Sequence, residues 1–119
     1  MPRFLRPNIG SRRPRLRTSA WAVGSSIPVI RSIWGFGSFF RQGAFSDIDL
    51  LVVVSVNHDE LLEALTQVRT LLRRRTSHWG IPIDMLLLTE REVQSRPLRD
   101  MHLLEPLFLR CTINRRRFW

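Results

Sequence analysis

The strongest constraint on the fold is a short apolar run, Leu-Leu-Val-Val-Val at residues 50–54, with polar residues on both sides. A strand with one solvent-exposed face alternates apolar and polar side chains, whereas this run is apolar at every position. Such a run is typical of a strand that is covered on both faces of its sheet. Residues 47–56 are therefore predicted to form the buried central strand.

Two aspartates, Asp47 and Asp49, open this predicted strand. Residues i and i+2 of a strand point to the same face, roughly 6.5–7 Å apart along the backbone, so both carboxylates project together. Two like charges at the mouth of a buried strand raise its free energy unless a cation lies between them. A divalent metal ion with oxygen ligands is the natural candidate. The alternative is that Asp47 only ends a turn and that Asp49 forms a salt bridge at a sheet edge.

Composition limits the classes of protein to which the chain can belong. Its 119 residues suit one domain, and its net charge of +9 comes from arginines alone, without a lysine. This balance favours polyanionic partners, such as nucleotides, nucleic acid or an acidic protein surface. Cys111 is the single cysteine, which fits a reducing cytoplasm. No apolar run reaches the roughly 18 residues that span a membrane, and no signal-peptide core stands near residue 1.

The two ends of the chain are basic. Residues 1–18 are rich in arginine and contain three prolines but no acid, so no long helix is expected there. We expect a disordered arm, or an upstream extension of the true start, outside a folded domain of residues 19–113. Nucleic-acid binding by this arm is the alternative, whereas its prolines count against a mitochondrial presequence. Residues 114–119 are expected to form a mobile basic tail.

Two more strands and several helices are predicted around the central strand. Residues 29–34 should form the first strand and residues 81–88 the third. Apolar residues recur at three- and four-residue intervals after Asn57, so the clearest helix should begin there, with Asn57 and Glu60 as its capping box. Its three terminal arginines are read either as a solvated helix end or as a phosphate contact. Residues 98–110 are expected to be helical in pieces.

A second capping box, Thr89 and Glu92, predicts a helix that begins near Glu90. The third strand that precedes it contains Asp84, in an expensive position for a lone acid. If that strand lies beside the central one, Asp84 comes next to Asp49. Three converging carboxylates would form an oxygen cage for one or two Mg²⁺ ions. Two ions about 3.5–4 Å apart suit an in-line phosphoryl displacement.

A turn upstream of the aspartates could hold phosphate groups. Gly37 and Ser38 follow the first predicted strand, and Ser38 can cap a short helix over residues 39–42. Backbone N–H groups at a helix start bind phosphate oxygens, and glycine lets the backbone approach closely. Arg41, about one turn further on, could face the same phosphates.

Together these segments resemble the signature of the polymerase-β-like nucleotidyltransferase superfamily, and most closely its minimal nucleotidyltransferase branch. The motif residues are Gly-Ser-Phe-Phe-Arg at residues 37–41 and Ser-Asp-Ile-Asp-Leu at residues 46–50, with the later acid Asp84. The resemblance covers about residues 29–88. In two departures from the pattern, Gln42 separates Arg41 from the glycine that commonly follows it, and the turn before the aspartates is short.

The resemblance implies a small α/β fold, with a mixed sheet and helices packed mainly on one face. It also implies transfer of a nucleoside monophosphate, foremost AMP from ATP, to an acceptor hydroxyl, with two Mg²⁺ ions as cofactors. Gly37 and Ser38 would hold the triphosphate, and Arg41 would contact it or support the turn. Asp47, Asp49 and Asp84 would be the catalytic acids and metal ligands, Asp84 also helping to deprotonate the acceptor.

The resemblance extends to partners. Similar minimal domains act as antitoxins that adenylylate a tyrosine of a HEPN-type toxin, and this is the specific expectation for the present chain. A small-molecule enzyme, similar to aminoglycoside nucleotidyltransferases, is one alternative, although those carry an additional helical domain. A non-catalytic module that uses its arginines to bind protein or RNA is another, and the three retained acids argue against it.

Overall fold

The computed structural model describes residues 7–40, 47–55, 57–95 and 104–110. Four strands form one sheet in the order β3-β2-β1-β4, in which β1 is antiparallel to β2 and β4, while β2 is parallel to β3. The elements are α1 (Pro7–Ser26), β1 (Ile30–Phe36), the 3-10 helix η1 (Ser38–Phe40), β2 (Ile48–Val54), η2 (His58–Glu60), α2 (Leu61–Thr76), η3 (Ser77–Trp79), β3 (Ile83–Thr89), α3 (Glu90–Ser95) and β4 (Glu105–Leu109).

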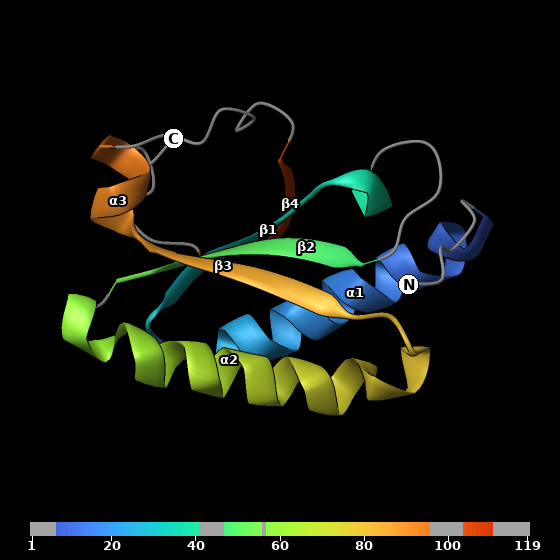
Figure 1. The fold of residues 1–119 in the computed structure, drawn as a ribbon, viewed down its shortest axis with the longest axis horizontal. Coiled ribbons are helices and arrows are strands. Elements are labelled where there is room, and N and C mark those ends of the chain that lie inside the picture. Colours follow the sequence, from blue (N-terminus) through green and yellow to red (C-terminus); the bar gives the residue numbers. More distant parts are fainter. Residues whose placement is uncertain (1–6, 41–46, 56, 96–103, 111–119) are drawn as a thin grey trace.

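Helices α1 and α2 lie together against one face of this mixed sheet, while α3 lies away from them beyond the end of β3 (Figure 1). This confirms the predicted α/β class with helices mainly on one face. Every residue of β2 except Asp49 is fully buried. Its even-numbered residues, such as Leu50 and Val52, pack towards α1 and α2, while Leu51 and Val53 pack with Val93 of α3 on the other face. The predicted central strand is confirmed, with shorter bounds than expected.

The expectation that no long helix forms near the N-terminus is wrong, because α1 begins at Pro7 and passes through Pro14. Proline is tolerated as the first residue of a helix, where its missing N–H has no partner to lose. At Pro14 tertiary packing outweighs propensity: Leu16, inside the supposed arm, has no exposed surface and packs in the core with Ala20 of the same helix. Residues 1–6, and the tail at 114–119, lie outside the described residues.

The expectation of helical pieces over residues 98–110 is also wrong for the part that the structure describes, because β4 pairs with β1. Pro106 is compatible with a strand here because β4 is at the edge of the sheet. Arg110 then fastens this edge to α1: its guanidinium donates to the carbonyl oxygens of Gly24, Ile27 and Ile30. These partners include carbonyls at the end of α1, which a helix cannot satisfy internally.

The two predicted capping boxes have different outcomes. At the start of α3 the box is confirmed, because Glu92 N–H donates to Thr89 Oγ1 at 3.1 Å and Thr89 N–H donates to Glu92 Oε1 at 3.0 Å. The box at Asn57 is wrong: a 3-10 turn intervenes, α2 begins only at Leu61, and Glu60 makes no side-chain cap. None of the helices that the structure describes is long and apolar enough to cross a membrane.

Candidate metal and nucleotide site

The parallel pairing of β2 with β3 brings the three predicted acids together. Asp49 is directly opposite Asp84 in the strand register, and Asp47 precedes the first residue of β2. One ligand oxygen from each of the three carboxylates lies within 4.8 Å of the other two. The two-residue spacing places Asp47 and Asp49 on the same face as Leu51 and Val53, away from α1 and α2.

Gly37 allows the backbone to pass close to this cluster. Its φ is +82°, and a Cβ built at this position would lie 2.3 Å from Asp49 Oδ2. No other residue type fits without moving the carboxylate or straining the backbone. The glycine predicted for the nucleotide turn is therefore in direct contact with one of the predicted metal ligands.

Aromatic packing holds the turn in place after Gly37. The Phe40 N–H donates to the Gly37 carbonyl at 3.1 Å, which closes the single turn η1. The Phe39 side chain is fully buried and meets the Phe40 ring edge-on at 4.9 Å. A Cβ at Gly35 would overlap that ring, so the absence of a side chain there makes room for Phe40. The Ser38 side chain and all of Arg41 lie outside the described residues, and their predicted phosphate contacts stay predictions.

Mutual repulsion and burial perturb the acids. Burial, a hydrogen bond with Asp84 and the charges of Asp49 and Asp84 raise the pKa of Asp47 from 3.8 to about 6. Burial and the charge of Asp84 also raise the pKa of Asp49. No arginine of the described segments forms an ion pair with any of the three. Salt bridges within the described segments therefore do not explain this cluster.

The donor set fits a hard divalent cation. Three carboxylates on two adjacent strands supply only oxygen ligands, which Mg²⁺ prefers, and they leave room for ligands from phosphate and water. The half-buried Asp47 and Asp49 contrast with Asp84, which is exposed on the edge strand β3. The arrangement can therefore hold metal-bound phosphates on the β2 side, while Asp84 stays open to a second reactant. The roles of the three acids as metal ligands stay predictions.

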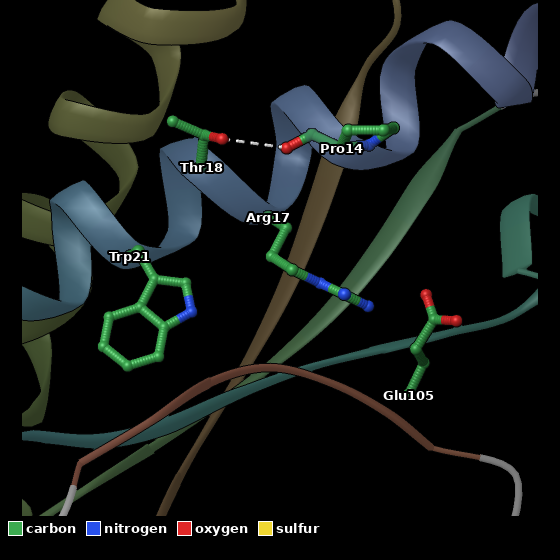
Figure 2. Close-up of a pocket in the computed structure, with 5 residues that line it drawn as sticks. All are labelled: Pro14, Arg17, Thr18, Trp21 and Glu105. Carbon is green, nitrogen blue, oxygen red and sulfur yellow. Dashed lines mark hydrogen bonds between the residues drawn. The ribbon is translucent and has the colours of Figure 1, made fainter.

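Two cavities lie on opposite edges of the sheet. One of about 310 Å³ is bordered by Asp84 together with residues at the end of α2, including Arg69 and Arg73. The sequence indicated a phosphate contact as one alternative for Arg73 but not for Arg69, although their i, i+4 spacing places both on one helix face. A larger cavity, of about 540 Å³, lies between α1 and β4 (Figure 2). Since β3 and β4 are opposite edges, the larger cavity is separate from the acids.

Comparison with known proteins supports the fold assignment. A crystal structure from Sulfolobus solfataricus, described as that of a putative nucleotidyltransferase, is similar with a TM-score of 0.59 and 22% sequence identity over 86% of each chain. The four-stranded mixed sheet with its helices is thus a nucleotidyltransferase-like fold. At this identity the similarity shows the fold and not the activity. No protein-family model matches the chain, and none of the curated proteins matches its sequence.

Proposed function

We propose that this protein is a metal-dependent nucleotidyltransferase, which moves a nucleoside monophosphate from a nucleoside triphosphate to an acceptor hydroxyl. The observation that carries the proposal is the convergence of Asp47, Asp49 and Asp84 to within 4.8 Å. The raised pKa values of Asp47 and Asp49 also support the proposal. Perturbed acids that have no cationic partner among residues 7–40, 47–55, 57–95 and 104–110 fit a functional site, because a folded protein gains no stability from them.

Residues at the beginning of β2 and on β3 would have different roles in the reaction. Asp47 and Asp49 would hold Mg²⁺, which when bound neutralises phosphate charge and favours displacement at phosphorus. Gly37 leaves its backbone free to approach the triphosphate beside Asp49. Asp84 would accept the proton of the acceptor hydroxyl. The hydroxyl oxygen forms a bond to the α-phosphorus, the bond from that phosphorus to the bridging oxygen breaks, and pyrophosphate leaves.

The finer assignments come from the sequence resemblance. ATP is the proposed donor and AMP the transferred group. The proposed acceptor is a tyrosine of a HEPN-type toxin encoded by a neighbouring gene, which would make this chain an antitoxin. A protein hydroxyl can reach Asp84 because that carboxylate is exposed at the edge of the sheet.

Label transfer tests the proposal. The protein is incubated with Mg²⁺, the product of the neighbouring gene and ATP labelled either at the α- or at the γ-phosphate. Label from the α-phosphate should enter the partner, and γ-label should not, because it leaves in pyrophosphate. Asp49→Asn should lower transfer by several orders of magnitude, while Asp59→Asn, which changes an exposed acid outside the cluster, should not. Transfer of γ-label, or full activity of Asp49→Asn, would refute the proposed reaction.

A further inference from the structure

Charge is segregated along α2. The acids Asp59, Glu60 and Glu63 stand at its beginning. Its second half carries four exposed arginines, which we call the cationic end of α2: Arg69, Arg73, Arg74 and Arg75. None of these four makes a hydrogen bond or an ion pair with another described residue. Their guanidinium groups are thus available for a ligand.

The helix dipole explains only part of this arrangement. Cations stabilise the last turn of a helix, and the effect falls off within that turn. Arg73, Arg74 and Arg75 are in the last turn of α2, which ends at Thr76. Arg69 is almost two turns before the end, so the dipole gives no reason for its charge. Its position one turn before Arg73, on the same side of the helix, points to a shared ligand.

The cationic end of α2 adjoins the proposed reaction site. Arg69 and Arg73 border the cavity of about 310 Å³ from one side, and Asp84 borders it from the other. The chain returns from α2 to β3 within a few residues, so the end of the helix lies beside the beginning of that strand (Figure 1). The glycine turn at Gly37 is on the other side of β2, where β1 ends. Ile83 and Met85 face α2, whereas the Asp84 side chain is on the other face of the sheet, so the cavity adjoins Asp84 across the edge strand β3.

The positive charge of this surface favours a phosphate backbone as its ligand. The cores of protein interfaces are rich in aromatic and apolar groups and depleted of charge. The cavity lining includes the apolar residues Leu72, Ile81, Pro82, Ile83 and Met85, but none of the exposed large apolar side chains of the described segments, which are Trp21, Leu62, Leu86 and Leu109. A third cavity, of about 400 Å³, lies on the α1 side of α2, with Arg15, Arg75 and His78 among its lining residues. Cationic groups on both sides of the end of α2 suit several phosphates in a row.

We propose that the cationic end of α2 binds the phosphate backbone of a single-stranded nucleic acid, with Arg69 and Arg73 contacting the phosphates nearest Asp84. The bound strand would continue towards Arg75 and Arg15. Binding depends only on the arginines and is independent of the proposed transfer to a tyrosine.

The probe is a fluorescein-labelled 15-residue oligouridylate, whose binding is followed by fluorescence anisotropy in EDTA and without nucleotide. The logarithm of the association constant should fall linearly with the logarithm of salt concentration, by about 0.7 for each phosphate contact. Arg69→Gln/Arg73→Gln should weaken binding about tenfold and lower the salt slope by about 1.4. Thermal melts establish that each variant is folded.

The matched control is Arg17→Gln/Arg91→Gln, which removes the same charge elsewhere. Arg17 points into the cavity beside β4 (Figure 2), and Arg91 is on α3 beyond the far end of β3. This control should retain most of the affinity. Equal losses of oligouridylate affinity in both double variants would show that binding reflects only the overall positive charge, and would overturn the proposal. So would the absence of salt-dependent binding.

Two further arms separate the ligands that could compete for this surface. A polyglutamate peptide of similar charge should bind weakly, and binding equal to that of the oligouridylate would identify an acidic protein partner instead. Millimolar ATP should leave the oligouridylate bound; displacement would assign the arginines to the donor triphosphate. Asp49→Asn should bind the oligouridylate as the wild type does. A wild-type protein that binds the oligouridylate but transfers no label would refute only the proposed reaction, and one that transfers label but does not bind the oligouridylate would refute only this inference.

Discussion

Raising the pH should destabilise the metal-free protein through Asp47, and Asp47→Asn should remove this effect. The pKa of Asp47 is raised from 3.8 to about 6, first by burial and then by Asp84 and Asp49. Between these two values the folded protein binds more protons at this carboxyl than the unfolded chain does. The free energy of unfolding therefore falls as pH rises through this window. The stabilising contribution of the Asp47 carboxyl is fully present only below its pKa in the unfolded chain.

The size of the effect follows from the shift in pKa. A shift of about two units corresponds to about 3 kcal/mol at 1.36 kcal/mol per unit. Because Asp47 is partly open to solvent, screening should reduce this to about 1 kcal/mol. For a domain of this size, a loss of that magnitude lowers the melting temperature by about 4 °C.

Urea unfolding in EDTA at pH 4.5 and pH 7.5 measures the effect. Other groups also titrate in this range, so the informative quantity is the difference in unfolding free energy between wild type and Asp47→Asn. This difference should change by about 1 kcal/mol in favour of the variant on going to pH 7.5. Asp59→Asn, at an exposed acid, controls for loss of one negative charge. An Asp47→Asn protein that is less stable than wild type at pH 7.5 would refute the reasoning, because it would show that the charge of Asp47 is stabilising.

Two substitutions test the packing around the site. Gly37→Ala should displace the Asp49 carboxylate and lower both nucleotidyl transfer and melting temperature. The control Gly80→Ala changes a glycine with a φ of +69° and no atom within 4 Å of the new Cβ, so it should cost about 1 kcal/mol of stability in a thermal melt and leave transfer intact. Equal loss of transfer in both variants would contradict this. Leu16→Ala should lower the unfolding free energy by about 2–5 kcal/mol because α1 belongs to the core, and deletion of residues 1–18 should impair folding. A stable truncated protein would show that α1 is dispensable.

The sequence predicted β2 and the acid cluster because both depend on local pattern. A short run that is apolar at every position is typical of a covered strand, and an Asp-x-Asp pair at the beginning of a strand places both carboxylates on one face. The convergence of Asp84 needed one additional assumption, that the third strand lies beside the second. The structure satisfies it through the register that pairs Asp49 with Asp84.

Helix α1 and strand β4 could not be predicted in this way, because tertiary contacts stabilise both. Pro14 and Pro106 are local signals against regular structure. They are outweighed where Leu16 enters the core and where β4 pairs with β1, 70 or more residues earlier in the chain. Arg110 donates to backbone carbonyls across a similar separation. From the charge pattern alone, all arginines are expected at the surface, so the structural role of Arg110 could not be predicted.

The crossover from β2 through α2 to β3 builds both charged parts of the site. Parallel pairing requires such a connection, and it places Asp84 in register with Asp49. The same connection ends in the arginines that border the cavity beside Asp84. A shift of β3 by one residue would turn Asp84 towards α2 and replace it with Ile83 or Met85, since successive strand residues point to opposite faces. The αL conformation of Gly80, which ends the helical segment before β3, therefore helps to set the geometry of the acids as well as the path of the chain.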